Sequence, residues 1–134
     1  MKKSSMGCAA LCATLAIGAG TASAAQAKSF TVIGKETSGH RAGHGFIFNE
    51  KLYANGHQVG RDHVKITPDG QGFAVEALFR FHRGKIKVAG AVHRGNDQSV
   101  PIVGGRGRFH GIKGTFTTTN VGKNLDRETF RFSH

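Results

Sequence analysis

Apolar and polar residues alternate most clearly in segment 73–82 of the chain. In an extended conformation, one face of this segment carries its apolar residues: Phe73, Val75, Ala77, Phe79 and Phe81. The opposite face carries its charged and imidazole side chains: Glu76, Arg80 and His82. A period of two residues is typical of a β-strand with one buried face.

The pattern recurs along the chain and predicts about eight short strands. Near the C-terminus, Glu128, Phe130 and Phe132 share one face of such a strand. The predicted strands are 30–33, 45–48, 59–67, 72–82, 85–93, 101–103, 114–119 and 128–132. No helical periodicity separates them, which favours an antiparallel barrel or sandwich. Because a closed sheet leaves no exposed edge, we predict an all-β fold, a small eight-stranded antiparallel barrel.

The composition agrees with this prediction. The chain contains 20 glycines and 10 phenylalanines. Glycine is common at the turns between strands, whereas aromatic and β-branched residues are common within them. An eight-stranded barrel has a lumen that either fills with side chains or holds one small ligand.

Segment 1–27 has the pattern of a secretory signal peptide, with two lysines ahead of an apolar stretch rich in small residues. We expect cleavage after Ala24 or after Ala27, and favour the later site because Lys28 begins a polar sequence. The stretch is too short for a membrane anchor, which needs about 20 strongly apolar residues. We therefore predict a cleaved signal peptide, one β-barrel domain at 28–134, secretion, and no insertion into a membrane.

Both cysteines, Cys8 and Cys12, lie within the predicted signal peptide. The exported domain would therefore contain no disulfide, although small exported domains commonly depend on them. Its stability must come from closure of the sheet, from packing, or from association with further copies. We expect a homodimer or homotrimer as the candidate assembly.

The chain is strongly basic, with a formal net charge of +11. Its lysines and arginines are scattered along the sequence, which is typical of a solvated surface that attracts anionic polymers. The sequence shows no clustered basic stripe interleaved with aromatic residues, so we predict no specific nucleic-acid binding.

Two parts of the chain resemble the allene oxide cyclase-like and dirigent barrels. Segments 48–53 (FNEKLY) and 59–63 (VGRDH) are similar to the early strands of that group. Segment 103–114 (VGGRGRFHGIKG) is similar to its late glycine turn and the strand that follows. The resemblance extends over nearly the whole predicted domain, from about residue 30 to residue 132.

This resemblance implies an eight-stranded barrel, often trimeric, with an apolar lumen. Members of the group shape a reactive small molecule so that it cyclises or couples with controlled stereochemistry, and some bacterial relatives cyclise polyketides. Confinement in a dry cavity lowers the entropic part of the barrier. We therefore expect a secreted barrel that binds a small apolar molecule and needs no cofactor. Whether it is also an isomerase or cyclase is left open.

The alternative is a non-enzymatic extracellular protein whose basic surface binds envelope polymers or a protein partner. The sequence contains no nucleophile elbow, phosphate-binding loop, HExxH motif or paired-carboxylate signature. It therefore predicts no hydrolase of extracellular polymers.

Three residues are candidates for a catalytic role: Glu76, Arg61 and Lys113. The resemblance suggests Glu76 as the carboxylate of the cyclases by its strand, although the alternation places it opposite the phenylalanines. Lys113 matches a basic residue that the group keeps before a glycine, whereas Arg108 stands where dirigent proteins commonly have an acid. Arg61 and its neighbour Asp62 must face opposite sides of a strand, so an inward Arg61 would bind a ligand carboxylate or ketone; the alternative is a charged pair at the barrel mouth.

The candidate lining of the lumen is a set of phenylalanines: Phe46, Phe48, Phe79, Phe81, Phe116 and Phe130. They form either a ligand cavity or a filled core, and the sequence does not decide between the two. Gly104, Gly105 and Gly107 could line a ligand mouth, but a structural turn is the favoured interpretation.

The eight histidines suggest a metal site, with His40 and His44 or His57 and His63 as pairs. Residues four apart meet on a helix but not on a strand, and no cysteine or nearby acidic ligand completes either set. We predict no metal site.

Overall fold

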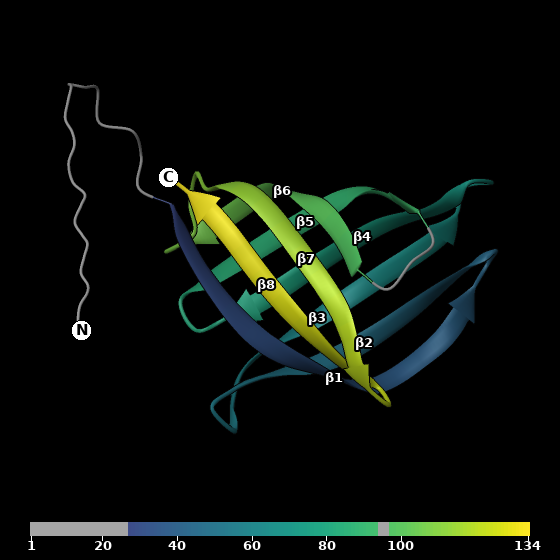
Figure 1. Ribbon diagram of the computed structural model, residues 1–134, viewed down its shortest axis with the longest axis horizontal. Coiled ribbons are helices and arrows are strands. Elements are labelled where there is room, and N and C mark those ends of the chain that lie inside the picture. Colours follow the sequence, from purple (N-terminus) through teal and green to yellow (C-terminus); the bar gives the residue numbers. More distant parts are fainter. Residues whose placement is uncertain (1–26, 94–96) are drawn as a thin grey trace, which may run out of the picture.

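The computed structural model describes residues 27–93 and 97–134. This part of the chain forms eight strands and no helix (Figure 1). The strands are β1 (Lys28–Ala42), β2 (Gly45–Ala54), β3 (His57–Pro68), β4 (Gly72–Phe81), β5 (Gly84–His93), β6 (Asp97–Gly107), β7 (Lys113–Gly122) and β8 (Leu125–Ser133). The predicted all-β fold is confirmed. The predicted signal peptide lies outside the described residues except for Ala27.

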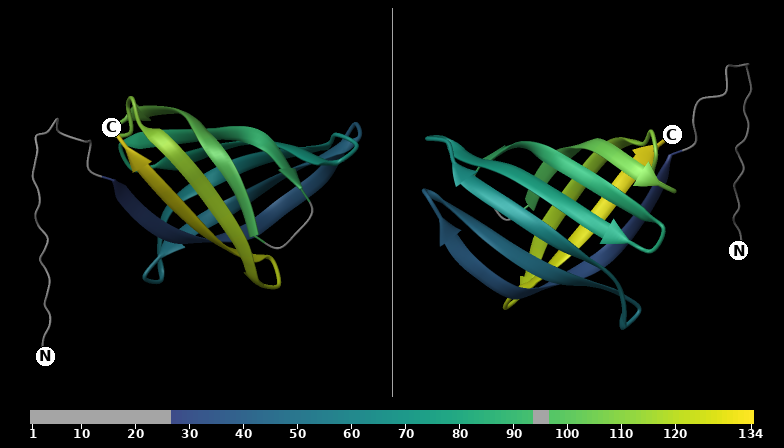
Figure 2. Two further views of the ribbon diagram at one scale, coloured as in Figure 1. Left: turned by 45° about the horizontal axis from the view of Figure 1, so that its top comes forward. Right: turned by 180° about the vertical axis from the view of Figure 1, so that it is seen from behind.

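The strands form a closed antiparallel barrel in which each pairs with the next in sequence and β8 pairs with β1 (Figures 1 and 2). Short turns connect most of them, as in an up-and-down barrel. Asn55 and Gly56 both have positive φ, 52° and 78°, and join β2 to β3. Positive φ at both central residues is the requirement of the tight hairpin turn that matches the twist of the sheet.

Several strands are longer than the sequence predicted, and β1 is the clearest case. Its 15 residues continue far beyond the predicted 30–33. The segment after Gly34 is mostly polar and exposed, so it lacks the alternation of a strand with one dry face. This segment is held extended because it pairs with β2 as far as Ala42, whose partner is Gly45. The register of the pairing shifts between Glu36 and Ser38.

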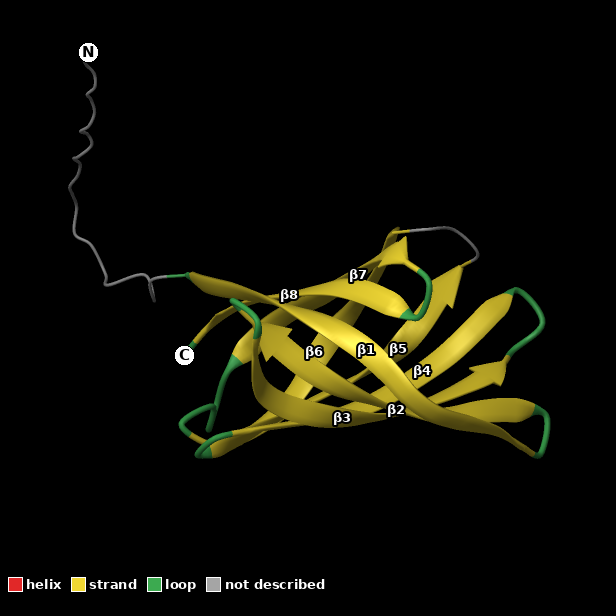
Figure 3. Ribbon diagram, turned by 90° about the horizontal axis from the view of Figure 1, so that it is seen from below, coloured by secondary structure: helices red, strands yellow, loops and turns green. Residues whose placement is uncertain are grey.

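One half of the barrel, which we call the closed half, contains the start of β1, the end of β8 and the loop between β6 and β7 (Figure 3). Four phenylalanines from separate parts of the chain pack together there and line a hollow of about 540 Å³: Phe30, Phe81, Phe109 and Phe132. In five of their six pairs, the ring centroids lie between 5.5 and 6.0 Å apart. Phe130 stacks on Phe30 at 4.9 Å and continues the cluster inward. Edge-to-face and offset contacts of this kind stabilise a core beyond area burial alone.

The other half, which we call the open half, carries smaller inward-facing side chains. Val75 and Ala77 of β4 face the lumen there, opposite Thr118 of β7. The hairpins β1–β2, β3–β4 and β7–β8 surround its mouth (Figure 3). No helix in the described part of the chain is long and apolar enough to cross a membrane.

Candidate functional site

The open half of the barrel contains a cavity of about 240 Å³. Its walls are mostly apolar and include Val64, Ala77, Phe79 and Phe116. A second hollow of about 470 Å³ lies at the mouth of the same half. The two share four lining residues, Phe48, Ile66, Val75 and Gln98, so the mouth leads into the lumen.

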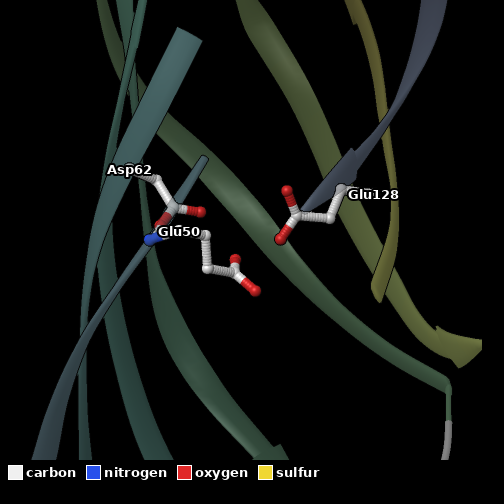
Figure 4. Close-up of side chains that lie close together, drawn as sticks. All are labelled: Glu50, Asp62 and Glu128. Atoms are coloured by element: carbon white, nitrogen blue, oxygen red, sulfur yellow. Dashed lines mark hydrogen bonds between the residues drawn. The ribbon is translucent and has the colours of Figure 1, made fainter. Parts of the chain in front are cut away.

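Three carboxyl side chains lie close together on the inner wall of the barrel: Glu50 of β2, Asp62 of β3 and Glu128 of β8 (Figure 4). Glu50 and Glu128 line the cavity, and Asp62 is buried beside Glu50. Each is at most 3% exposed. One oxygen from each carboxyl lies within 4.8 Å of one oxygen from each of the others. Glu50 and Asp62 are direct cross-strand partners, and the Glu50 backbone N–H donates a hydrogen bond to Asp62 Oδ1 at 3.0 Å.

Strand β1 separates Glu50 from Glu128, and a glycine lets the two carboxyls approach across it. Gly34 is the inward-facing residue of β1 that lies between the two carboxyls. A Cβ at this position would lie 2.9 Å from Glu50 Oε1 and 3.0 Å from Glu128 Oε1. The missing side chain of Gly34 therefore provides the space that the carboxyl cluster occupies.

Burial raises the pKa of all three carboxyls, because the lumen solvates a negative charge poorly. The pKa of Asp62 is raised from 3.8 to about 10, first by burial and then by its hydrogen bond with Glu50 and the Glu50 charge. Burial, together with the charges of Glu50 and Asp62, raises the pKa of Glu128 well above its ordinary value. No cation in the described part of the chain acts on these groups to lower their pKa values.

One oxygen of each carboxyl has no hydrogen-bond partner among the described residues: Glu50 Oε2, Asp62 Oδ2 and Glu128 Oε1. An unpaired buried polar atom is costly, so these atoms are available to a ligand or a proton. Chemically, the cluster can exchange protons with a bound molecule. Three carboxylate oxygens this close could also ligate a divalent cation such as Ca²⁺ or Mg²⁺.

The structure places the three catalytic candidates outside the lumen. Asp62 is the inward member of the Arg61–Asp62 pair, and Arg61 is exposed. Glu76 is exposed on the outer face of β4, on the side that the alternation indicated, and Lys113 is also exposed. These three side chains therefore lie on the outer surface and do not meet in the cavity.

The phenylalanines predicted to line the lumen divide between its two halves. Phe79 and Phe116 form walls of the cavity, and the half-buried Phe48 lies between the cavity and the mouth. Phe46 is 46% exposed at the mouth, whereas Phe81 belongs to the closed half. Phe130 is fully buried and contacts Phe79 and Phe116. Both halves therefore contain aromatic side chains next to open space. In the closed half the rings pack on one another beside a hollow of about 540 Å³, and in the open half they line the cavity of about 240 Å³.

The three glycines predicted to form a turn lie away from the lumen cavity, at the end of β6. Gly107 has a φ of +64°, and a Cβ at Gly105 would collide with the Phe109 backbone oxygen. A Cβ at Gly104 would meet no other atom within 4 Å, so that position is open. Backbone conformation and close approach therefore require glycine at two of the three positions.

Sequence reasoning missed the carboxyl cluster, although the pattern contained its signal. Glu50 alternates with Phe48 and Leu52, and Glu128 shares a face with Phe130 and Phe132. An acidic residue in register with apolar ones on a half-buried strand points inward. The histidines of both pairs considered as metal ligands are exposed. Among the described residues, the side chains close enough together to hold a metal ion are the carboxyls of Glu50, Asp62 and Glu128.

No protein-family model matches the sequence, and neither does any curated protein. Two solved structures are similar to the barrel. A pyocyanin demethylase matches with a TM-score of 0.71 and 20% identity, over 79% of this chain and 100% of that one. A pterocarpan synthase dirigent protein matches with a TM-score of 0.62 and 11% identity, over 82% and 89%. The chain therefore has the fold of the dirigent and allene oxide cyclase-like barrels, as the sequence predicted.

Proposed function

We propose that the open half of the barrel binds a small, largely apolar molecule, and that the buried carboxyls transfer protons to and from it. The activity would be that of a cofactor-free isomerase or cyclase. The observation that carries this proposal is the position of two carboxyls with raised pKa values, Glu50 and Glu128, in the wall of a mostly apolar cavity that opens to the surface, with Asp62 buried beside them.

A pair of carboxyls in different protonation states can act as acid and base at neutral pH. Glu128 lines the cavity and its pKa is raised well above the ordinary value, so it holds a proton that it can donate to an oxygen or nitrogen of the ligand. Glu50, which also lines the cavity, can accept a proton released elsewhere on the ligand, while Asp62, with a pKa of about 10, keeps its own proton beside it. The apolar walls keep water away and hold the ligand near its reacting geometry.

The names of the structural neighbours support this class of function. One is a demethylase of pyocyanin and the other a pterocarpan synthase, so both names describe enzymes of small organic molecules. The proposal for this chain shares with them a small-molecule ligand in a barrel of the same fold. The chemistry comes from its own carboxyl cluster.

The remaining parts of the proposal concern where the protein acts. We propose that the chain is secreted after cleavage of segment 1–27 and assembles as a dimer or trimer. Native mass spectrometry of protein from the culture medium of its own host would measure both properties. A mature chain that begins at Lys28 in a single oligomeric state is the expected result; a full-length chain retained in cells would contradict secretion.

Ligand binding can be tested with N-phenyl-1-naphthylamine, a neutral apolar probe whose fluorescence rises in dry sites. The same substitution on the two faces of β4 gives matched variants. Ala77→Phe fills the cavity, because Ala77 is buried and lines it, whereas Ala74→Phe adds the ring to the exposed face. We expect the fluorescence rise with wild type and Ala74→Phe, and its loss with Ala77→Phe.

Equal fluorescence from both variants would overturn the lumen as the binding site, and so would no rise with any protein. If Ala77→Phe does not fold, Val75→Phe makes the same test nearer the mouth, since Val75 lines both hollows. Native mass spectrometry after incubation with pyocyanin adds a chemically defined ligand. A one-to-one complex per chain that Ala77→Phe abolishes would support the proposal.

A further inference from the structure

Six basic residues form a row around the outside of the barrel, one on each of β1 to β6. Each is the direct cross-strand partner of the next, and all six side chains are exposed. We call this row the basic belt; it consists of Lys35, Lys51, Arg61, Arg80, Lys85 and Arg106. The scattered basic residues of the sequence are therefore gathered by the register of the sheet.

Such a row is unfavourable for the fold. Like charges directly opposite each other on neighbouring strands are destabilising, whereas opposite charges or threonines in those positions stabilise the pair. The β7–β8 wall of the same barrel has the favourable arrangement. There, Arg127 pairs with Thr119 and Arg131 pairs with Thr115. The belt is thus a local feature, and the overall positive charge does not explain it.

The belt presents its cations at a regular spacing. Neighbouring strands lie about 4.8 Å apart, so the backbone positions that carry these cations follow one another at about that interval across the strands. Beside the belt, a hollow of about 310 Å³ is lined by Lys85, Lys87, Arg106, Leu78 and two glycines, Gly104 and Gly105. Because these glycines have no side chains, a bound chain could contact the backbone of β6 there.

A row of evenly spaced cations matches a linear polymer with evenly spaced anions. Single-stranded nucleic acids are usually held by aromatic side chains that stack on bases, and the belt contains no aromatic residue. Three of the six belt residues are arginines, whose planar guanidinium groups suit carboxylates. The spacing is close to the length of one sugar ring.

We propose that the basic belt binds a linear polysaccharide that carries a carboxylate on each sugar. The convex surface lets a flexible polymer contact neighbouring cations in turn, and several weak contacts on one chain add up to useful affinity. Arg61 and Arg80 lie in the middle of the row. This site lies outside the lumen and is independent of the function proposed there.

Binding of labelled polygalacturonate fragments, measured by fluorescence anisotropy at low and moderate salt, tests the proposal. Arg61→Gln with Arg80→Gln removes two charges from the belt. Arg127→Gln with Arg131→Gln removes the same charge from β8, outside the belt, where both side chains are exposed. We expect the belt variant to lose affinity by roughly tenfold and to depend less steeply on salt, with a much smaller loss for the β8 variant.

Equal losses in the two double variants would overturn the proposal, because net charge alone would then explain binding. Tighter binding of labelled oligo-dT than of polygalacturonate would overturn the choice of polysaccharide. Labelled dextran, which is neutral, should not bind. If the belt variant unfolds, Lys85→Gln gives a single-charge test in the other half of the row. Every folded belt variant should keep wild-type fluorescence with N-phenyl-1-naphthylamine, which separates this site from the lumen.

Discussion

The two halves of the lumen are built from the same eight strands but differ in the side chains that face inward. In the closed half, rings from β1, β4, β8 and the β6–β7 loop pack on one another, mostly edge to face, beside a hollow of about 540 Å³. In the open half, the inward residues of β4 include the small Val75 and Ala77, and they line a cavity of about 240 Å³. Closure of the sheet sets the shape of the barrel, whereas the size of each inward residue decides what occupies it.

The same comparison separates stability from function. The closed half supplies a dense aromatic core to a domain that contains no cysteine in 28–134. The open half buries Glu50, Asp62 and Glu128, each with an oxygen that has no described partner. Buried carboxyls of this kind destabilise a fold unless they hold a proton or a ligand. Destabilising arrangements of this kind are common at functional sites.

Truncating the centre of the aromatic cluster should have the largest effect on stability. Phe130 is fully buried and contacts rings on β1, β4 and β7 at 4.9 to 5.7 Å. We expect Phe130→Ala to lower the free energy of unfolding by about 3–5 kcal/mol. Phe48→Ala, in the half-buried wall of the open half, should cost less than about 2 kcal/mol. Urea denaturation measures both, and equal costs would contradict the division into two halves.

Removing a titrating carboxyl from the open half should change how stability depends on pH. The pKa of Asp62 is raised from 3.8 to about 10, so the folded protein keeps a proton that the unfolded chain releases. The stability from this proton is complete below about pH 4 and is lost as the pH rises towards 10. Asp62→Asn should therefore raise the urea midpoint at pH 8 and flatten its decline with pH.

Glu76→Gln is the matched control for this prediction. Glu76 lies on the exposed face of β4, away from the buried cluster, so its loss should leave the contribution of Asp62 to stability unchanged. A wild-type protein whose urea midpoint rises from pH 5 to pH 9 would contradict the direction of the Asp62 shift.

A methyl group placed within the carboxyl cluster should have an intermediate effect. The added Cβ of Gly34→Ala would lie 2.9 and 3.0 Å from oxygens of Glu50 and Glu128, so these side chains must move. We expect a loss of about 1–3 kcal/mol in the free energy of unfolding, together with weaker binding of the apolar probe. Gly104→Ala, where nothing lies within 4 Å, should change neither. If Gly34→Ala were as harmless, the carboxyls would not be held as described.

The smallest effect on the free energy of unfolding is expected for a substitution on the outer surface, which should change the packing of neither half of the lumen. Arg80 lies directly between Arg61 and Lys85 on the outer surface. Arg80→Thr should raise the free energy of unfolding by about 0.2–1 kcal/mol, because two like-charge pairs are relieved. Arg131→Thr, whose partners are Thr115 and Ser29, should give no such gain. A loss of stability in Arg80→Thr would show that the belt is not under electrostatic strain.

The alternation of apolar residues was enough to predict the strands and the closed fold, because side chains of a half-buried strand repeat every two residues. It also indicated that Glu128 shares a face with Phe130. It could not show that Glu128, Glu50 and Asp62 meet, since they come from β8, β2 and β3 and are brought together only when β8 pairs with β1.

The basic belt was hidden for a related reason. Its six residues are spread from Lys35 to Arg106, and only the register of five strand pairs aligns them. If the register of one strand pair shifted by one residue, the belt residue on the shifted strand would face the lumen instead of the solvent. The sequence alone does not fix the register to this precision.

The contrast between the halves depends on carboxyls that stay protonated in the open half. Carbon-detected NMR of the side-chain carboxyls, recorded from about pH 3 to pH 10, measures their titration residue by residue. The carboxyls of Glu50, Asp62 and Glu128 should titrate above the ordinary values of their residue types, with Asp62 near pH 10 and coupled to its neighbours. If these three carboxyls titrate near pH 4, the cluster is solvated and the proposed proton-transfer site is not present.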